Sequence, residues 1–213
     1  KIYEYHSSLV RNKVYRNRNR EKLTRITDTV KNNSKVPLLK VWSINTDGLA
    51  SPGEQHDLLL RAEKEAVHVL IAQETRFKDT YTIPIGNWLL ISSGVHDKKD
   101  KTGVAIYLNP KIKDAVINYW TVSDRIISTT FMTKAGPVAI INHHAPDEPK
   151  DLETKTAHWD LLGKTVSEIQ SDAIVLVIGD CNIRWHGRFK EEEDILGPYI
   201  FWQRPGVFRH SPT

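Results

Sequence analysis

Residues 173–182 read Ala-Ile-Val-Leu-Val-Ile-Gly-Asp-Cys-Asn, an unbroken apolar run that ends abruptly in polar residues. A continuous apolar run of this length is typical of a strand that is buried on both faces of a sheet. The run follows residues 152–169, where large apolar side chains recur on or near one face of a predicted helix, namely Trp159, Leu161, Leu162 and Val166. A helix that leads into a buried strand favours an α/β fold.

The same arrangement occurs earlier in the chain. Residues 38–44 are predicted to form a strand that ends at Asn45, and an amphipathic helix over 54–67 leads into an apolar strand over 67–72. Short strands with hairpin-length connections then follow at 88–92, 103–108, 126–132 and 138–142, and 115–122 is a candidate fifth. We therefore expect an α/β fold of two packed mixed β-sheets flanked by helices, a four-layer α/β/β/α sandwich.

Polar residues stand at four of these strand ends: Asn45, Glu74, His144, and Asp180 with Asn182. Strand ends that meet at one rim of a sheet would bring their oxygen ligands together, as a hard cation such as Mg²⁺ requires. Each residue also has a structural interpretation. Asn45 and Asp180 could cap loops, Glu74 could pair with Arg76 or another base, and His144 could be a rim residue with its hydrogen bonds satisfied.

Positive charge is concentrated at the N-terminal end. Residues 1–40 hold eleven Lys and Arg against three acidic residues, whereas the whole chain has a net charge of only +4. Closely spaced basic residues without a sustained apolar stripe are typical of an arm that contacts phosphates, and a solvated leader without a partner is the alternative. The candidate nucleic-acid-binding residues of this arm, residues 1–36, are Arg11, Lys13, Arg16, Arg18, Arg20, Lys22 and Arg25.

Composition argues against two classes of protein. No apolar run approaches the length of a membrane span, and no secretory signal opens the chain, so we expect neither a membrane protein nor a secreted one. The single cysteine, Cys181, cannot form an internal disulfide and favours a reducing, intracellular compartment. Because Lys1 is not a methionine, we expect a processed precursor, for instance one that has lost an organelle-targeting peptide, and a trimmed chain end is the alternative. A lost targeting peptide suggests a mitochondrion or another organelle, with the nucleus as the alternative.

Six motifs occur in an order and spacing that resemble the endonuclease/exonuclease/phosphatase superfamily, and within it the endonuclease domains of LINE-type retrotransposons. They are Ile44-Asn45-Thr46-Asp47-Gly48, Gln73-Glu74-Thr75, Gly103-Val104-Ala105-Ile106-Tyr107, Asp124-Arg125-Ile126-Ile127, His144-Ala145-Pro146 and Ile178-Gly179-Asp180-Cys181-Asn182. The resemblance covers roughly residues 37–200. Single pieces are common in proteins, but the ordered set is specific.

The resemblance implies a role for each matching residue. Glu74 is expected to be the principal Mg²⁺ ligand, supported by Asn45. Asp180 would align or deprotonate the attacking water, and Asn182 would hold a phosphate oxygen. His144 stands where relatives have the tyrosine of a Tyr-Ala-Pro motif, so it is the third candidate catalytic residue.

The later motifs of the family, an Asp-containing strand and Ser-Asp-His, are not visible before Thr213, and Arg209-His210-Ser211-Pro212 follows Asp180 too closely to replace them. We therefore expect a C-terminally truncated family domain over 37–196, followed by an aromatic and basic tail over 197–213. The tail could stack on bases, or pack against its own domain or a protein partner.

Two hypotheses of function follow. The first is a nuclease-derived nucleic-acid-binding protein that is inactive, needs no cofactor and serves as a structural component of a nucleoprotein assembly such as an organellar ribosome. Other protein chains would then cover the incomplete sheet. The alternative is an active Mg²⁺-dependent endonuclease that cleaves phosphodiester bonds in DNA, and a phosphatase or other phosphodiesterase of the same fold is a third interpretation.

Overall fold

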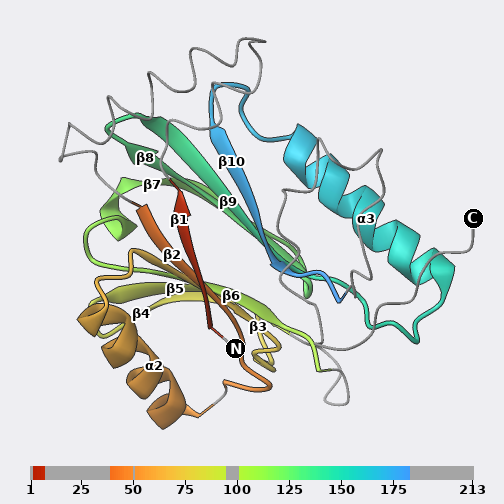
Figure 1. Ribbon diagram of the computed structural model, residues 1–213, viewed down its shortest axis with the longest axis horizontal. Coiled ribbons are helices and arrows are strands. Elements are labelled where there is room, and N and C mark those ends of the chain that lie inside the picture. The colour runs from red at the N-terminus through yellow and green to blue at the C-terminus, as the bar shows by residue number, and fades with distance from the viewer. Residues whose placement is uncertain (1, 8–38, 50, 95–100, 183–213) are drawn as a thin grey trace, which may run out of the picture. The chain divides into compact units, whose positions relative to one another are not determined.

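A computed structural model describes residues 2–7, 39–49, 51–94 and 101–182. Its first sheet has six strands in the order β1-β2-β3-β6-β5-β4 (Figure 1). β2 and β3 are parallel, and the other neighbouring pairs are antiparallel. The strands are β1 (Ile2–Ser7), β2 (Leu39–Asn45), β3 (Val69–Gln73), β4 (Tyr81–Ile85), β5 (Trp88–Ser93) and β6 (Val104–Leu108).

The second sheet has four strands in the order β10-β9-β8-β7. β7 (Val116–Ser123), β8 (Ile126–Thr133) and β9 (Gly136–His144) form an antiparallel meander, and a short 3₁₀ helix, η1 (Lys113–Ala115), precedes it. β10 (Ile174–Asp180) returns parallel to β9 after a helical crossover. Both sheets are therefore mixed, and each has one parallel pair whose carboxyl ends point to the same edge.

Apolar residues of both sheets fill the space between them. This central core includes Val69, Ile71 and Ile106 from the first sheet, and Phe131 and Ile140 from the second, all fully buried. Because alternate residues of a strand face opposite sides of a sheet, the remaining apolar residues point outward and need a cover.

Two helices supply that cover, which gives the four layers (Figure 1). Helix α2 (Pro52–Lys64) packs Leu58, Leu59 and Ala62 on the outer face of the first sheet. Helix α3 (Leu152–Ser167) packs Leu162 on the second sheet, and the Asp151 side chain accepts a hydrogen bond from the Thr154 amide at its N-terminus. No helix of the described residues combines the length and apolar character that a membrane span needs.

The predicted sandwich is thus confirmed, and its elements begin and end within a few residues of the predicted positions. Two strands were not predicted. β4 contains Pro84, which weakens a strand signal but is tolerated because β4 is at the edge of its sheet. β1 lies within the stretch assigned to the basic arm, and its backbone pairs antiparallel with β2. Residues 11–25 and the 197–213 tail lie outside the described residues, so these assignments and the domain bounds stay predictions.

One buried amide joins the two sheets below the rim. The Asn142 side chain on β9 is fully buried, and its Nδ2 donates to the carbonyl oxygens of Ala72 (2.9 Å) and Ala105 (3.0 Å). Its Oδ1 accepts from Gln73 Nε2 at 2.7 Å, and the same Gln73 nitrogen donates to Ser43 Oγ at 3.2 Å. Every polar atom of the Asn142 side chain therefore has a partner on the facing sheet.

Replacing Asn142 with leucine should destabilise the protein strongly, because the substitution leaves Gln73 Nε2 without this acceptor and two buried carbonyls without this donor. We expect a loss of about 3 kcal/mol or more in the free energy of unfolding, measured by urea denaturation. Thr129 offers a matched control, because it is also buried but hydrogen-bonds within its own sheet, to the Asn118 carbonyl. Thr129→Val should cost clearly less; an equal cost would contradict the special role of Asn142.

Candidate functional site

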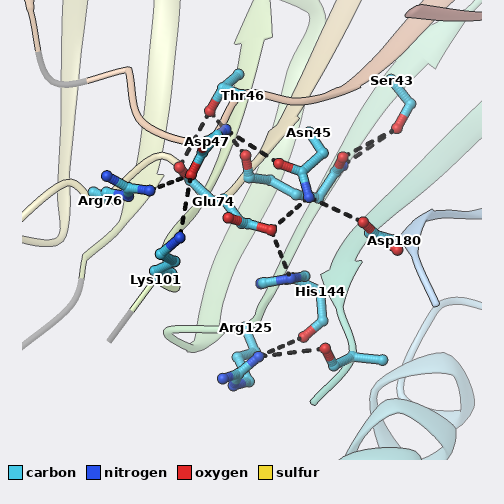
Figure 2. Close-up of polar contacts among 12 residues, drawn as sticks. Ser43, Asn45, Thr46, Asp47, Glu74, Arg76, Lys101, Arg125, His144 and Asp180 are labelled. Carbon is cyan, nitrogen blue, oxygen red and sulfur yellow. Dashed lines mark hydrogen bonds and ion pairs between the residues drawn. The ribbon is translucent and has the colours of Figure 1, made fainter. Parts of the chain in front are cut away.

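Four of the predicted site residues converge at one rim of the sandwich (Figure 2). Asn45 is the last residue of β2 and Glu74 follows β3, while His144 and Asp180 are the last residues of β9 and β10. Asn45 is opposite Gln73 in the first parallel pair, and His144 is opposite Asp180 in the second. The two registers bring all four side chains to the same edge.

The Asn45 amide connects carboxylates that come from different sheets. Its Nδ2 donates to Glu74 Oε1 at 2.6 Å and to Asp180 Oδ2 at 3.0 Å. Both carboxylates belong to strand ends, and they are 29 and 135 residues from Asn45 in the chain. The predicted proximity of Asn45, Glu74 and Asp180 is therefore observed, and the alternative that Asn45 only caps a loop does not account for these contacts.

The backbone turns sharply at Glu74 so that its side chain reaches the rim. Glu74 has a positive φ of 53°, which is uncommon for a residue other than glycine. Its carbonyl oxygen accepts from the Gly48 amide at 2.7 Å and from Thr46 Oγ1 at 3.2 Å. Because such conformations cost free energy and occur preferentially at functional sites, this turn supports a functional role for Glu74.

His144 lies against Glu74 on the other side of the rim. Its Nε2 is 3.7 Å from Glu74 Oε1, and its side chain is only 2% exposed. Burial and the nearby Arg125 guanidinium lower the pKa of His144 below its usual value, against the opposing effect of Glu74, Asp180 and Asp147. Arg125 is fixed here because its Nη1 donates to the carbonyls of His144 and Ala145 at 3.3 and 3.4 Å.

A second histidine cluster lies on the opposite face of β9. His143 Nδ1 is 3.4 Å from His158 Nε2 on α3, and His143 Nε2 is 3.7 Å from Cys181 Sγ. The Trp159 ring makes edge contacts with both imidazoles. Burial lowers the pKa of His143 and of His158 to about 4, and it raises the pKa of the Cys181 thiol. This cluster joins α3 to the turn that follows Asp180.

The residues that support the rim were not predicted from the sequence, unlike the four polar residues at the strand ends. Gln73, Asn142, Arg125 and the pair His143 and His158 were not predicted as parts of the site. Isolated polar residues in apolar strands were the available signal, since a buried polar side chain needs a partner.

Asn182 follows Asp180 by two residues and has a positive φ of 46°. Arg76, suggested as a partner of Glu74, instead pairs with Asp47.

The donors at the rim fit a hard cation. Carboxylate oxygens of Glu74 and Asp180 approach the same Asn45 nitrogen, so they face one small volume, and oxygen donors are the ligands that Mg²⁺ prefers. The described part of the chain holds no group of three or more His, Cys, Asp and Glu placed to bind a metal together. A cation here would therefore be held by few protein ligands and would keep several waters, as Mg²⁺ commonly does.

Gly179 sets the distance between β9 and β10. A Cβ atom added at this position would lie 1.9 Å from the His143 carbonyl oxygen, which is backbone and cannot rotate away. We expect Gly179→Ala to lower the free energy of unfolding by about 3 kcal/mol, measured by thermal or urea denaturation. Gly163→Ala in α3 is the control, because nothing lies within 4 Å of its added Cβ, and it should be neutral or stabilising.

The buried pair His143 and His158 should make stability depend on pH. Their folded pKa of about 4 is below the usual histidine value, so the unfolded chain takes up protons first as the pH falls. Stability should therefore decrease from about pH 6.5 to about pH 4, by up to roughly 1.4 kcal/mol per pH unit for each histidine. His158→Gln should make the measured decrease shallower. The exposed His56, changed to Gln, should leave it unaltered.

Comparison with known proteins agrees with this fold. The family model described as "Endonuclease/Exonuclease/phosphatase family" matches residues 19–210. A search of curated proteins finds no significant match. Among solved structures, the endonuclease domain of TRAS1, a telomere-specific non-LTR retrotransposon, is 16% identical with a TM-score of 0.51 over 68% of this chain and 60% of that one.

Two other structures share the fold to the same extent. D. rerio TDP2 complexed with a single-strand DNA product is 17% identical, with a TM-score of 0.50 over 68% of this chain and 60% of that one. The AP endonuclease LMAP from Leishmania major is 13% identical, with a TM-score of 0.51 over 72% of this chain and 60% of that one. The chain thus spans about 60% of the length of these structures. With the family model matched along most of its length, the chain belongs to the endonuclease/exonuclease/phosphatase family.

Proposed function

We propose that this chain is a nuclease-derived nucleic-acid-binding protein that holds a backbone phosphate and Mg²⁺ at the rim formed by Asn45, Glu74 and Asp180. The observation that carries the proposal is the Asn45 amide, which donates to a carboxylate from each sheet. An isolated phosphate would be repelled by two carboxylates, so a cation is needed for an anion to bind here. The structure of D. rerio TDP2 complexed with a single-strand DNA product has a similar fold, which supports a nucleic acid as the ligand.

The rim residues would have different roles, because some would hold the Mg²⁺ and others would orient a water near the phosphate. Glu74 would hold the Mg²⁺, which would polarise a phosphate oxygen and lower the pKa of a bound water. Asn45 would support this ligand, because its Nδ2 donates to the Glu74 carboxylate. The Asp180 carboxylate, which accepts from Asn45 Nδ2, would accept a hydrogen bond from a water near the phosphate and orient it. His144 Nε2 faces Glu74 and restricts how that carboxylate can move.

His144 is the reason to expect binding with slow or no cleavage. Relatives have a tyrosine at this position of the motif, and the imidazole ring is shorter than a phenol, so its donor reaches less far toward a phosphate. The His144 ring is also almost completely buried and lies against Glu74. Loss of one such donor costs about 10² to 10³ in the rate of a hydrolytic step.

Active cleavage is the second candidate function, and one observation favours it. The carboxylates of Glu74 and Asp180, to which the resemblance gives roles in the reaction, both accept a hydrogen bond from the same Asn45 amide. If cleavage occurs, His144→Tyr should raise its rate, because the phenol would extend toward the phosphate.

A role within a nucleoprotein assembly, with protein partners on the sheets, is a further part of the first proposal. It is supported by Val177, an apolar residue in the middle of β10 that is 44% exposed.

The test compares binding and cleavage in one set of samples. Binding of a fluorescent DNA duplex to the full chain is measured by anisotropy with Mg²⁺ and with EDTA, and the same samples are resolved on a gel. We expect Mg²⁺ to strengthen binding. Glu74→Gln should weaken that Mg²⁺ effect about tenfold or more, because it removes the main charged ligand.

Glu153→Gln is the matched control, since Glu153 is an exposed residue of α3 and the substitution makes the same change of charge. It should behave like the wild type. Binding that is equal with Mg²⁺ and with EDTA would overturn the proposed site. Cleavage by the wild type that Glu74→Gln and Asp180→Asn both abolish would replace the binding function with the endonuclease function.

A further inference from the structure

Two cations share one carboxylate next to the rim. Arg76 Nη2 contacts Asp47 Oδ1, and Lys101 Nζ is 3.8 Å from the same oxygen (Figure 2). One negative charge therefore faces two positive charges, and the group has a net charge of +1. The side chains are also accessible, because Arg76 is 39% exposed and Lys101 is 68% exposed.

Backbone hydrogen bonds hold these residues in place. The Arg76 amide donates to the Thr102 carbonyl at 3.0 Å, and the Thr75 amide donates to the Gly103 carbonyl at 3.0 Å. These bonds bring the segment after β3 against the segment before β6, which places Arg76 beside Lys101. The Leu49 amide also donates to the Thr75 carbonyl at 3.0 Å, so the loop that contains Asp47 is joined to the same segment.

The conformation of this cluster costs free energy that its ion pair alone does not offset. Asp47 and Arg76 both have positive φ values, 47° and 55°. Arg76 Nε is buried and has no hydrogen-bond partner among the described residues. An exposed ion pair contributes only about 0 to 1 kcal/mol, which does not offset two left-handed residues and an unsatisfied buried donor. Such a cost is expected where function rather than stability fixes the geometry.

The cluster is attached to the phosphate site through Asn45. The Asp47 amide donates to Asn45 Oδ1 at 3.1 Å, while Asn45 Nδ2 faces Glu74 and Asp180. Figure 2 shows Arg76 and Lys101 on one side of Asn45 and Glu74, and Asp180 on the other. Arg76 and Lys101 thus both lie on the side of the rim away from Asp180. A polynucleotide that reaches them from the rim would extend to that side.

We infer that Arg76 and Lys101, held by Asp47, form a second anion subsite that binds the backbone phosphate next to the one at the rim. The inference rests on the proposed function, because it needs a polynucleotide with one phosphate at Glu74 and Asn45. Arg76 can present two N–H groups to a phosphate in a fork, and Lys101 adds a mobile point charge. The excess positive charge would be neutralised by that phosphate.

Salt dependence of DNA binding tests the inference. We measure the affinity of the full chain for a short duplex at several KCl concentrations in Mg²⁺. Each phosphate contact contributes about 0.9 to the slope of log affinity against log salt. Because Arg76 and Lys101 together neutralise one phosphate, Arg76→Gln/Lys101→Gln should reduce this slope by about 0.9. Arg76→Lys should keep the wild-type slope because it keeps the charge. Lys134→Gln is the control, since Lys134 is exposed and lies just before β9, whose other end carries His144.

Duplexes with one methylphosphonate at successive positions locate the phosphate. Neutralising the phosphate at the subsite should weaken binding to the wild type several-fold and leave binding to Arg76→Gln/Lys101→Gln unchanged. Melting temperatures check that the variants fold, and Lys101→Gln alone gives a second measurement at a highly exposed position. It should reduce the slope by less than the double substitution does, because Arg76 remains at the subsite.

The outcomes separate the two proposals. A wild-type slope in Arg76→Gln/Lys101→Gln, together with a Mg²⁺ effect that Glu74→Gln removes, would overturn the subsite and leave the rim site standing. DNA binding that does not depend on Mg²⁺ or on Glu74 would overturn both. A reduced slope with no methylphosphonate position that distinguishes wild type from variant would show a diffuse charge effect and would also contradict the subsite.

Discussion

The geometry of the candidate site depends on one buried side chain, the Asn142 amide between the two sheets. Asn45 and Glu74 belong to the first sheet, while His144 and Asp180 belong to the second, so the site exists only if the sheets keep a fixed relative position. Apolar packing is not directional and permits small sliding movements. The hydrogen bonds from Asn142 to the Ala72 and Ala105 carbonyls are directional, and they lie two residues from the end of β9. They fix the register where the site needs it.

The rim brings two negatively charged carboxylates, Glu74 and Asp180, to one neutral amide, Asn45. Glu74 and Asp180 face the same Asn45 nitrogen, and their carboxylates repel each other when both are ionised. A dipole on Asn45 reduces this repulsion, and a cation would remove more of it. The neighbouring Asp47 carboxylate has a different role, because Arg76 and Lys101 neutralise it. Glu74, Asp180 and Asp47 therefore have different roles although all three lie near strand ends. Glu74 and Asp180 share the Asn45 amide, whereas Asp47 pairs with two cations.

The sequence predicted the layers and the convergence of Asn45, Glu74, His144 and Asp180, because both follow from periodicity and from polar residues at the ends of apolar strands. The role predicted for Asn182 stays a prediction. The sequence did not predict β4, since Pro84 hides an edge strand whose ladder does not need that amide. It did not predict the cluster of Asp47, Arg76 and Lys101 either. That cluster depends on left-handed backbone at Asp47 and Arg76, and on loop hydrogen bonds between segments far apart in the chain. No local pattern of residues encodes such contacts. The role of Asn142 was equally hidden, because one amide in an apolar strand does not reveal its partners.

Two consecutive residues at the end of β9 serve opposite faces of the sheet. His144 points to Glu74, and His143 points to His158 on α3. Because a strand alternates faces with every residue, an insertion or deletion of one residue in β9 would exchange these two environments. The contact of His144 with Glu74 and the contact of His143 with His158 therefore depend on the same register of β9. We therefore expect changes of length to disturb the site less in the β8–β9 turn or after Ala145, where the alternation of faces along the strand is not altered.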